Sequence, residues 1–122
     1  MATTDAIAFE VTGDAIPKQS FRYGRKHGYT PEPVRTWETT VAWKAAEAMT
    51  GRAPLTGHIR MKLLFKLGNR RRRDVDNLAK PVLDGCKAGG MYKDDSQIVD
   101  LHITKSFTAP TAASVLVTVE EM

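Results

Sequence analysis

Four aspartates in two pairs are the residues of this chain best suited to chemistry. Asp74 and Asp76 flank a single valine, and Asp94 and Asp95 follow about one helix and one turn later. If the chain stays extended after the preceding strand, the side chains of Asp74 and Asp76 point the same way. A right-handed helical excursion that returns to a neighbouring strand is expected to bring both pairs to the same end of a sheet. Three or four carboxylates are therefore expected to converge.

Converging carboxylates favour a divalent metal site. They repel one another and are costly to desolvate unless a cation holds them. Hard oxygen ligands suit Mg²⁺ or Mn²⁺, which remain partly hydrated and take further ligands from a phosphate. This is the ligand chemistry of metal-assisted phosphodiester hydrolysis, in which the ion activates water and offsets charge in the transition state.

Basic residues gather beside the first aspartate pair. Four consecutive arginines, Arg70 to Arg73, directly precede Asp74. A second basic group lies in a segment predicted to be an exposed loop, residues 16–29, and consists of Lys18, Arg22, Arg25 and Lys26. The two groups hold eight of the eighteen lysines and arginines, in a chain whose formal net charge is +4. Such clusters are suited to hold the anionic backbone of a nucleic acid where a metal acts.

Each of these residues also has a simpler interpretation. Asp76 or Asn77 can cap the helix that follows, and Asp94 and Asp95 can be ordinary turn residues. The arginine run can be a solvated loop or a non-specific polyanion patch. Under these interpretations the chain is a basic DNA-binding module without catalysis.

The hydrophobic pattern predicts four strands and two helices. The first helix starts at Thr30 or Thr36 and ends before Gly51, and the second runs from Asp76 or Asn77 to about Lys87. Strands are expected over residues 6–12, 58–67, 98–105 and 114–120. The order β-α-β-α-β-β predicts an α/β (α+β) fold: a small mixed four-stranded sheet, with a final hairpin and two packed helices.

The second helix carries two different faces. Leu78, Val82, Leu83 and Cys86 form its apolar stripe, whereas Asp76, Lys80 and Asp84 follow one another at intervals of four on another face. Pro81 is tolerated only near the first turn.

Length and composition bound the protein class. The chain has 122 residues, of which 42% are hydrophobic and 26% charged, and we expect a single domain over 1–122. Cys86 is the only cysteine, so an intrachain disulfide is impossible. With no long apolar run and no signal-peptide pattern, we expect a soluble, cytoplasmic protein with no membrane partner.

Residues 70–105, "RRRRDVDNLAKPVLDGCKAGGMYKDDSQIVDLHITK", resemble the RusA family of Holliday junction resolvases, which are small metal-dependent endonucleases. The shared pattern is a basic run, Asp-x-Asp-Asn, a lysine shortly afterwards, and Asp-Asp-Ser-Gln-Ile at the entry to a strand. The resemblance implies a small α/β fold and a homodimer. The first half matches more loosely, because a common Arg-Pro-Arg pattern is absent, and Gly85 stands where the family often has alanine.

The resemblance also implies residue roles. The essential acidic residues, which are also the metal ligands, fall on Asp74, Asp76 and Asp95, the catalytic lysine falls on Lys80, and Asn77 and Asp94 match in supporting positions. The function implied is a Mg²⁺-dependent enzyme, with Mn²⁺ as an alternative metal, that nicks four-way DNA junctions in paired strands. A metal nuclease acting on flaps or RNA is the nearest alternative.

Overall fold

The computed structural model describes residues 6–18 and 32–122, and it has four strands, two helices and two short 3₁₀ turns over them. The elements in chain order are β1 (Ala6–Thr12), α1 (Glu32–Ala48), β2 (Ile59–Leu67), α2 (Val75–Ala88), η1 (Asp95–Gln97), β3 (Ile98–Phe107), η2 (Pro110–Ala112) and β4 (Ser114–Glu121). This order and the mixed sheet confirm the predicted fold class.

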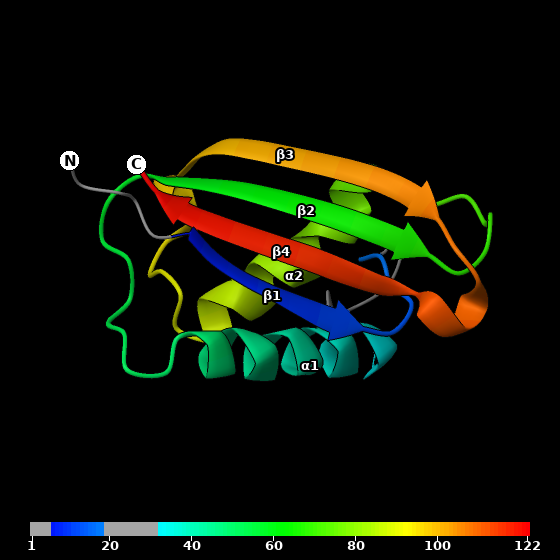
Figure 1. Cartoon of the computed structure of the whole chain (residues 1–122), viewed down its shortest axis with the longest axis horizontal. Helices are drawn as coiled ribbons and strands as arrows, with labels where there is room; N and C mark the ends of the chain where they lie inside the picture. The colour runs from blue at the N-terminus through cyan, green and yellow to red at the C-terminus, as the bar shows by residue number, and fades with distance from the viewer. Residues whose placement is uncertain (1–5, 19–31) are drawn as a thin grey trace, which may run out of the picture.

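The sheet has the strand order β1-β4-β2-β3, so β3 and β1 lie at its edges (Figure 1). β2 and β3 run parallel, whereas β4 is antiparallel to both β1 and β2. The predicted final hairpin is therefore wrong, because β3 and β4 are not neighbours. Val115, Val117 and Val119 of β4 are fully buried, because they lie on the face of the sheet that the helices cover.

The helices pack on one face of the sheet, with α2 behind the strands in Figure 1. The alternation predicted for β2 is confirmed, since Ile59, Met61, Leu63, Phe65 and Leu67 are all buried. Trp37 and Val41 of α1 and Leu78 and Val82 of α2 belong to the same core. The core thus fixes α2, the element that carries most of the predicted site.

Two glycines allow α1 and α2 to approach closely. A Cβ atom built on Gly85 would lie 2.7 Å from Val41 Cβ and 2.9 Å from the Glu38 carbonyl oxygen. A Cβ atom on Gly89 would lie 2.6 Å from the carbonyl oxygen of Ala42. The contact between the helices therefore requires glycine at position 85. The sequence showed only that Gly85 stands where the family often has alanine, and it did not show this reason.

The helix starts differ from those predicted. Thr36 lies inside α1 rather than at its start, and the alternative start at Thr30 and Pro31 lies outside the described residues. In α2 the N-cap is Asp74, so Asp76 and Asn77 belong to the first turn instead of capping it. Over the described ranges, no helix is both long and apolar enough to cross a membrane.

Candidate functional site

Asp74 and Asp76 lie together at the N-terminal end of α2. Asp74 has extended backbone angles as the N-cap, yet its carboxylate makes no capping hydrogen bond. Asp76 is exposed in the first helical turn. Neither carboxylate has a hydrogen-bond or ion-pair partner among the residues that the structure describes. The simple capping role is therefore wrong for Asp76, and both carboxylates are available to a ligand.

Lys80 lies one turn further along α2 and is exposed. Its spacing of four residues from Asp76 places both on one face of the helix. Asp84, its other possible partner at that spacing, instead contacts Lys18, whose Nζ lies 3.5 Å from the Asp84 carboxylate. Within the described part of the chain no ion pair involves Lys80, so its ammonium group is also available.

Pro81 lies inside α2, in its second turn, later than the predicted limit. It has no N–H to donate to the carbonyl of Asn77, four residues earlier. The backbone N–H of Lys18 takes that place and donates to the Asn77 oxygen at 2.9 Å. The segment that enters the predicted basic loop is thus hydrogen-bonded to the helix that carries Lys80.

The four arginines do not behave alike. Arg70, Arg71 and Arg72 are exposed, and the Arg70 guanidinium lies 4.6 Å from the centre of the Phe107 ring. The side chain of Arg73 is only 9% exposed, and its Nη1 contacts the Asp14 carboxylate at 3.1 Å. Arg73 also donates to backbone oxygens of the chain. Contrary to the prediction, Arg73 braces the loop, and only the other three face solvent where a phosphate can reach them.

The two aspartates of the second pair have different contacts. Asp94 caps η1, because its side chain accepts from the Ser96 N–H at 3.1 Å and Gln97 closes a reciprocal capping box. Its interpretation as a turn residue is confirmed. Asp95 is exposed and has no hydrogen-bond or ion-pair partner among the described residues.

The two pairs do not meet within one chain. β2 and β3 are parallel, so Asp74 follows the C-terminal end of β2 and Asp95 precedes the N-terminal end of β3. The whole of α2, about 20 Å of helix, separates these positions. In Figure 1 the C-terminal end of β2 and the N-terminal end of β3 lie at opposite ends of the sheet. The expected convergence in one chain is wrong, and no three acidic, histidine or cysteine side chains of the described residues form a metal site.

The other predicted basic residues are only partly described. Lys18 is half-buried between solvent and Asp84. Arg22, Arg25 and Lys26 lie outside the described residues.

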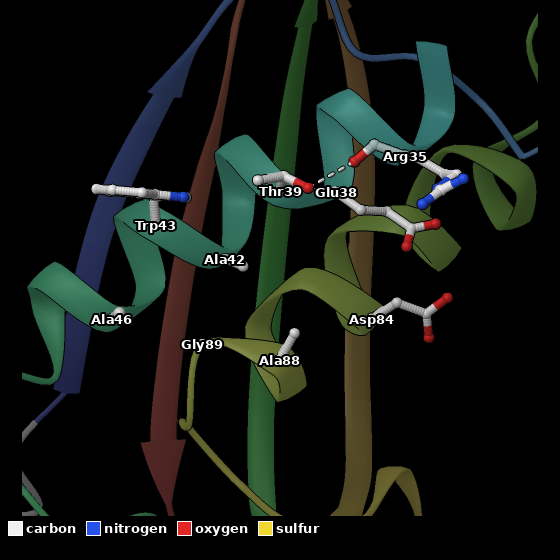
Figure 2. Close-up of a pocket in the computed structure, with 9 residues that line it drawn as sticks. All are labelled: Arg35, Glu38, Thr39, Ala42, Trp43, Ala46, Asp84, Ala88 and Gly89. Carbon is white, nitrogen blue, oxygen red and sulfur yellow. Dashed lines mark hydrogen bonds between the residues drawn. The ribbon is translucent and has the colours of Figure 1, made fainter. Parts of the chain in front are cut away.

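A hollow of about 440 Å³ lies elsewhere, on the outer side of the two helices. Figure 2 shows Trp43 and Ala42 of α1 on one side of it and Ala88 of α2 on the other, with Glu38 and Asp84 near one end. None of the predicted catalytic residues lines it.

Burial raises the pKa of the core thiol of Cys86 to about 12, so that cysteine is not a nucleophile at neutral pH.

Comparison with known proteins decides the family. The family described as "Endodeoxyribonuclease RusA" matches residues 12–120. The crossover junction endodeoxyribonuclease RusA of Aquifex aeolicus (strain VF5) is 33% identical over 93 residues, which cover 74% of this chain and 72% of the relative. The protein of the same name from Escherichia coli (strain K12) is 36% identical over 85 residues, 70% of each chain. This chain belongs to the RusA family.

A shorter match to the RusA protein of Enterobacteria phage 82 has the same 36% identity over 47 residues, which are 38% of this chain. The RusA match over 12–120 includes every predicted site residue, from Lys18 to Asp95. Their individual roles in this chain remain predictions.

Two residues that hold the arginine loop, Asp14 and Lys105, were not identified from the sequence. The Asp14 carboxylate accepts from the Gly68 N–H and from the Asn69 amide, both at 3.2 Å. Lys105 Nζ donates to the Arg73 carbonyl at 2.7 Å. Asp14 is 54 residues from Gly68 in sequence. No local pattern could therefore reveal these contacts, although a lone aspartate after a strand-ending glycine offers a weak signal.

Proposed function

We propose that this protein is an endonuclease that cuts four-way DNA junctions by paired nicks and acts as a homodimer with a divalent metal ion, Mg²⁺ or Mn²⁺. The observation that carries the proposal is the N-terminal end of α2. Asp74 and Asp76 lie there with no hydrogen-bond or ion-pair partner among the described residues, beside three exposed arginines and with Lys80 one turn away. A domain that only binds DNA gains nothing from unused acidic groups facing phosphate.

The roles follow from charge and position. Arg70, Arg71 and Arg72 hold the phosphate backbone, because they are exposed and directly precede the carboxylates. Lys80 acts in the chemical step, after the DNA is bound. A compact ammonium group close to the scissile phosphate stabilises negative charge that grows in the transition state more than charge already present in the ground state.

The metal is supported by donor chemistry more than by geometry. Carboxylate oxygens are the ligands that Mg²⁺ prefers. The resemblance assigns three of them, Asp74, Asp76 and Asp95. A single chain does not assemble that set, because the parallel arrangement of β2 and β3 separates Asp95 from the other two.

The proposal is tested with labelled four-way, forked and linear DNA and a matched RNA junction, each with and without Mg²⁺. We expect paired nicks in the four-way DNA only when the metal is present. Asp74→Asn, Asp76→Asn and Asp95→Asn should each abolish cleavage but preserve binding, since each removes a negative charge from a surface that meets phosphate. Asp94→Asn is the matched control and should reduce cleavage less, because Asp94 caps η1.

Three outcomes would contradict the proposal. Equal cutting of linear DNA would exclude structure selectivity, and preferred cutting of the fork or the RNA would favour the alternative nuclease. Binding without cutting at any metal concentration would favour a non-catalytic DNA-binding domain.

A further inference from the structure

We infer that Asp14 is a positioning residue for cleavage: it keeps the guanidinium of Arg73 away from the DNA phosphates and thereby fixes the loop that presents Asp74. This loop, the arginine loop, consists of residues 68–74 and connects β2 to α2. The inference rests on the proposed function, which places Asp74 at the cleavage site, and it adds to that function a residue outside the predicted site.

Asp14, Asn69 and Arg73 form a closed ring of side-chain contacts. Arg73 Nη1 lies 3.1 Å from Asp14 Oδ1, and Arg73 Nη2 donates to Asn69 Oδ1 at 2.9 Å. The Asn69 amide completes the ring by donating to Asp14 Oδ2 at 3.2 Å. Asp14 Oδ1 also accepts from the backbone N–H of Gly68 at 3.2 Å. Asp14 therefore holds the arginine loop at its first residue and again just before Asp74.

A turn after β1 brings Asp14 to this loop. Gly13 has a φ of +119°, a conformation that residues with a side chain rarely adopt, and its N–H donates to the Ala113 carbonyl at 2.9 Å. The turn places Asp14 against Gly68, which lies 54 residues later in the sequence. The contact thus depends on the fold and not on neighbouring residues.

Burial explains why Arg73 needs the Asp14 carboxylate. The Arg73 side chain is only 9% exposed, and a guanidinium keeps its charge in proteins. A buried charge is costly unless an opposite charge and hydrogen bonds compensate it. Asp14 supplies the opposite charge, and the carbonyl oxygens of Ala15 and Asn69 accept from the same guanidinium. Without the Asp14 charge, the guanidinium gains by turning outward to water and to phosphate.

The backbone is fixed on both sides of Asp74. Lys105 Nζ donates to the Arg73 carbonyl at 2.7 Å, and the Asp74 carbonyl accepts from the Leu78 N–H at 3.0 Å. The Asp74 carboxylate itself makes no capping hydrogen bond. Its position is therefore set by the backbone and, through Arg73, by Asp14. A displacement of about 1 Å in a reacting group can lower a rate by about 100-fold.

The salt dependence of DNA binding tests whether Asp14 keeps Arg73 from phosphate. The probe is linear duplex DNA without metal, so no cleavage is involved. Each phosphate contact adds about 0.9 to the slope of log affinity against log salt. Asp14→Asn should free Arg73 for one more contact and steepen the slope by about one. Asp14→Asn combined with Arg73→Gln should return the slope to the wild-type value.

Glu10→Gln is the matched control for charge. Glu10 lies on β1, and its Oε2 accepts from Ser114 Oγ at 2.8 Å. Within the described residues, its carboxylate has no hydrogen bond or ion pair with the arginine loop. Glu10→Gln removes the same charge as Asp14→Asn and should leave the slope unchanged. Asp14→Glu keeps the charge beside Arg73 and should also keep the wild-type slope.

Cleavage tests the positioning role. With Mg²⁺ and saturating protein, single-turnover nicking of a four-way junction should be at least ~10-fold slower for Asp14→Asn. The same variant should bind DNA more tightly at low salt, because it makes one more phosphate contact. A change that only lowered stability would weaken binding and cutting together. Opposite changes in affinity and rate, measured well below each Tm, therefore distinguish positioning from stability.

A second variant opens the ring at another position. Asn69→Ala removes the acceptor of Arg73 Nη2 but leaves Asp14 beside Nη1. The slope and the rate should change in the same directions as for Asp14→Asn, but by less. If Asp14→Asn does not fold, Asn69→Ala supplies both measurements.

Two results would overturn the inference. A wild-type slope for both Asp14→Asn and Asn69→Ala would show that Arg73 stays away from phosphate without this ring. A cutting rate within two-fold of wild type would show that the position of Asp74 does not depend on it. The proposed function stands in both cases, because the wild-type chain still cuts junctions. If the wild-type chain cuts no branched DNA, the proposed function fails, and the role of Asp14 in cleavage fails with it.

Discussion

Replacing Gly85 with alanine changes the contact that sets the position of α2 relative to α1. The added Cβ would lie 2.7 Å from Val41 Cβ, about 1 Å closer than an ordinary van der Waals contact. Overpacking of this kind costs about 1–3 kcal/mol, whereas alanine gains about 0.8–1.0 kcal/mol over glycine inside a helix. The variant should therefore lose up to about 2 kcal/mol of stability.

The loss is measured by thermal unfolding. At about 2.1 cal/mol/K per residue, unfolding of 122 residues has an entropy of about 0.26 kcal/mol/K, so the expected decrease in Tm is up to about 8 °C. A double-mutant cycle with Val41→Ala supplies the control. Val41→Ala removes Cγ1, which also lies 2.7 Å from the added Cβ, but keeps Val41 Cβ, so the two changes should be only partly less harmful together than separately, with a coupling of about 0.5 kcal/mol.

A higher Tm for Gly85→Ala would refute this reasoning, because helix propensity alone would then decide the outcome and the close approach of α1 would be wrong. Cleavage gives a second measurement. A displaced α2 moves Lys80 relative to the arginine loop, so the rate at permissive temperature should fall although no charged group has changed.

Substitutions at Lys80, in the arginine run and at Glu38 have distinct expected results. Lys80→Ala should bind junctions almost normally and cut them at least ~100-fold more slowly in single-turnover assays. Lys80→Arg should recover little of the lost rate. A rate for Lys80→Ala within a few-fold of wild type would show that Lys80 is an ordinary surface residue. Arg71→Ala with Arg72→Ala should lower the slope of log affinity against log salt by about two, whereas Arg73→Ala should lower Tm and leave the slope unchanged. Burial first, and then Asp84, raises the pKa of Glu38. Its stabilising contribution is therefore present below its ordinary pKa and lost as pH rises, so Glu38→Gln should raise Tm at pH 7 and leave it unchanged at pH 4.

Local patterns predicted the elements well because burial imposes them residue by residue. The alternation of β2 and the apolar stripe of α2 are direct consequences of one buried face. The strand order could not be read in this way. Nothing local distinguishes β4 as the neighbour of β3 from β4 as the strand inserted between β1 and β2.

The candidate site was predicted by residue type but not by position. Asp74, Asp76 and Lys80 do lie at one end of α2, because helical spacing fixes them. The placement of Asp95 depends on the direction of β3, and a right-handed crossover to a parallel strand returns the chain to the opposite end of the sheet. Arg73 looked like its three neighbours in the sequence, and its contacts with Asp14, Ala15 and Asn69 distinguish it in the structure.

The hydrogen bond between Lys18 and Asn77 has a consequence for how the family can vary in sequence. It joins two backbone groups, so side-chain changes at either position leave it possible, and only a proline at 18 would remove the donor. The Asn77 carbonyl needs the N–H of Lys18 as a donor only because Pro81 has no N–H of its own. An alanine there would let α2 satisfy the Asn77 carbonyl internally, and the amide of Lys18 would exchange its hydrogen faster with solvent. A more regular α2 would thus weaken the attachment of the segment at Lys18 to the helix. Pro81, a residue that usually breaks helices, is therefore the residue that keeps this segment hydrogen-bonded to α2.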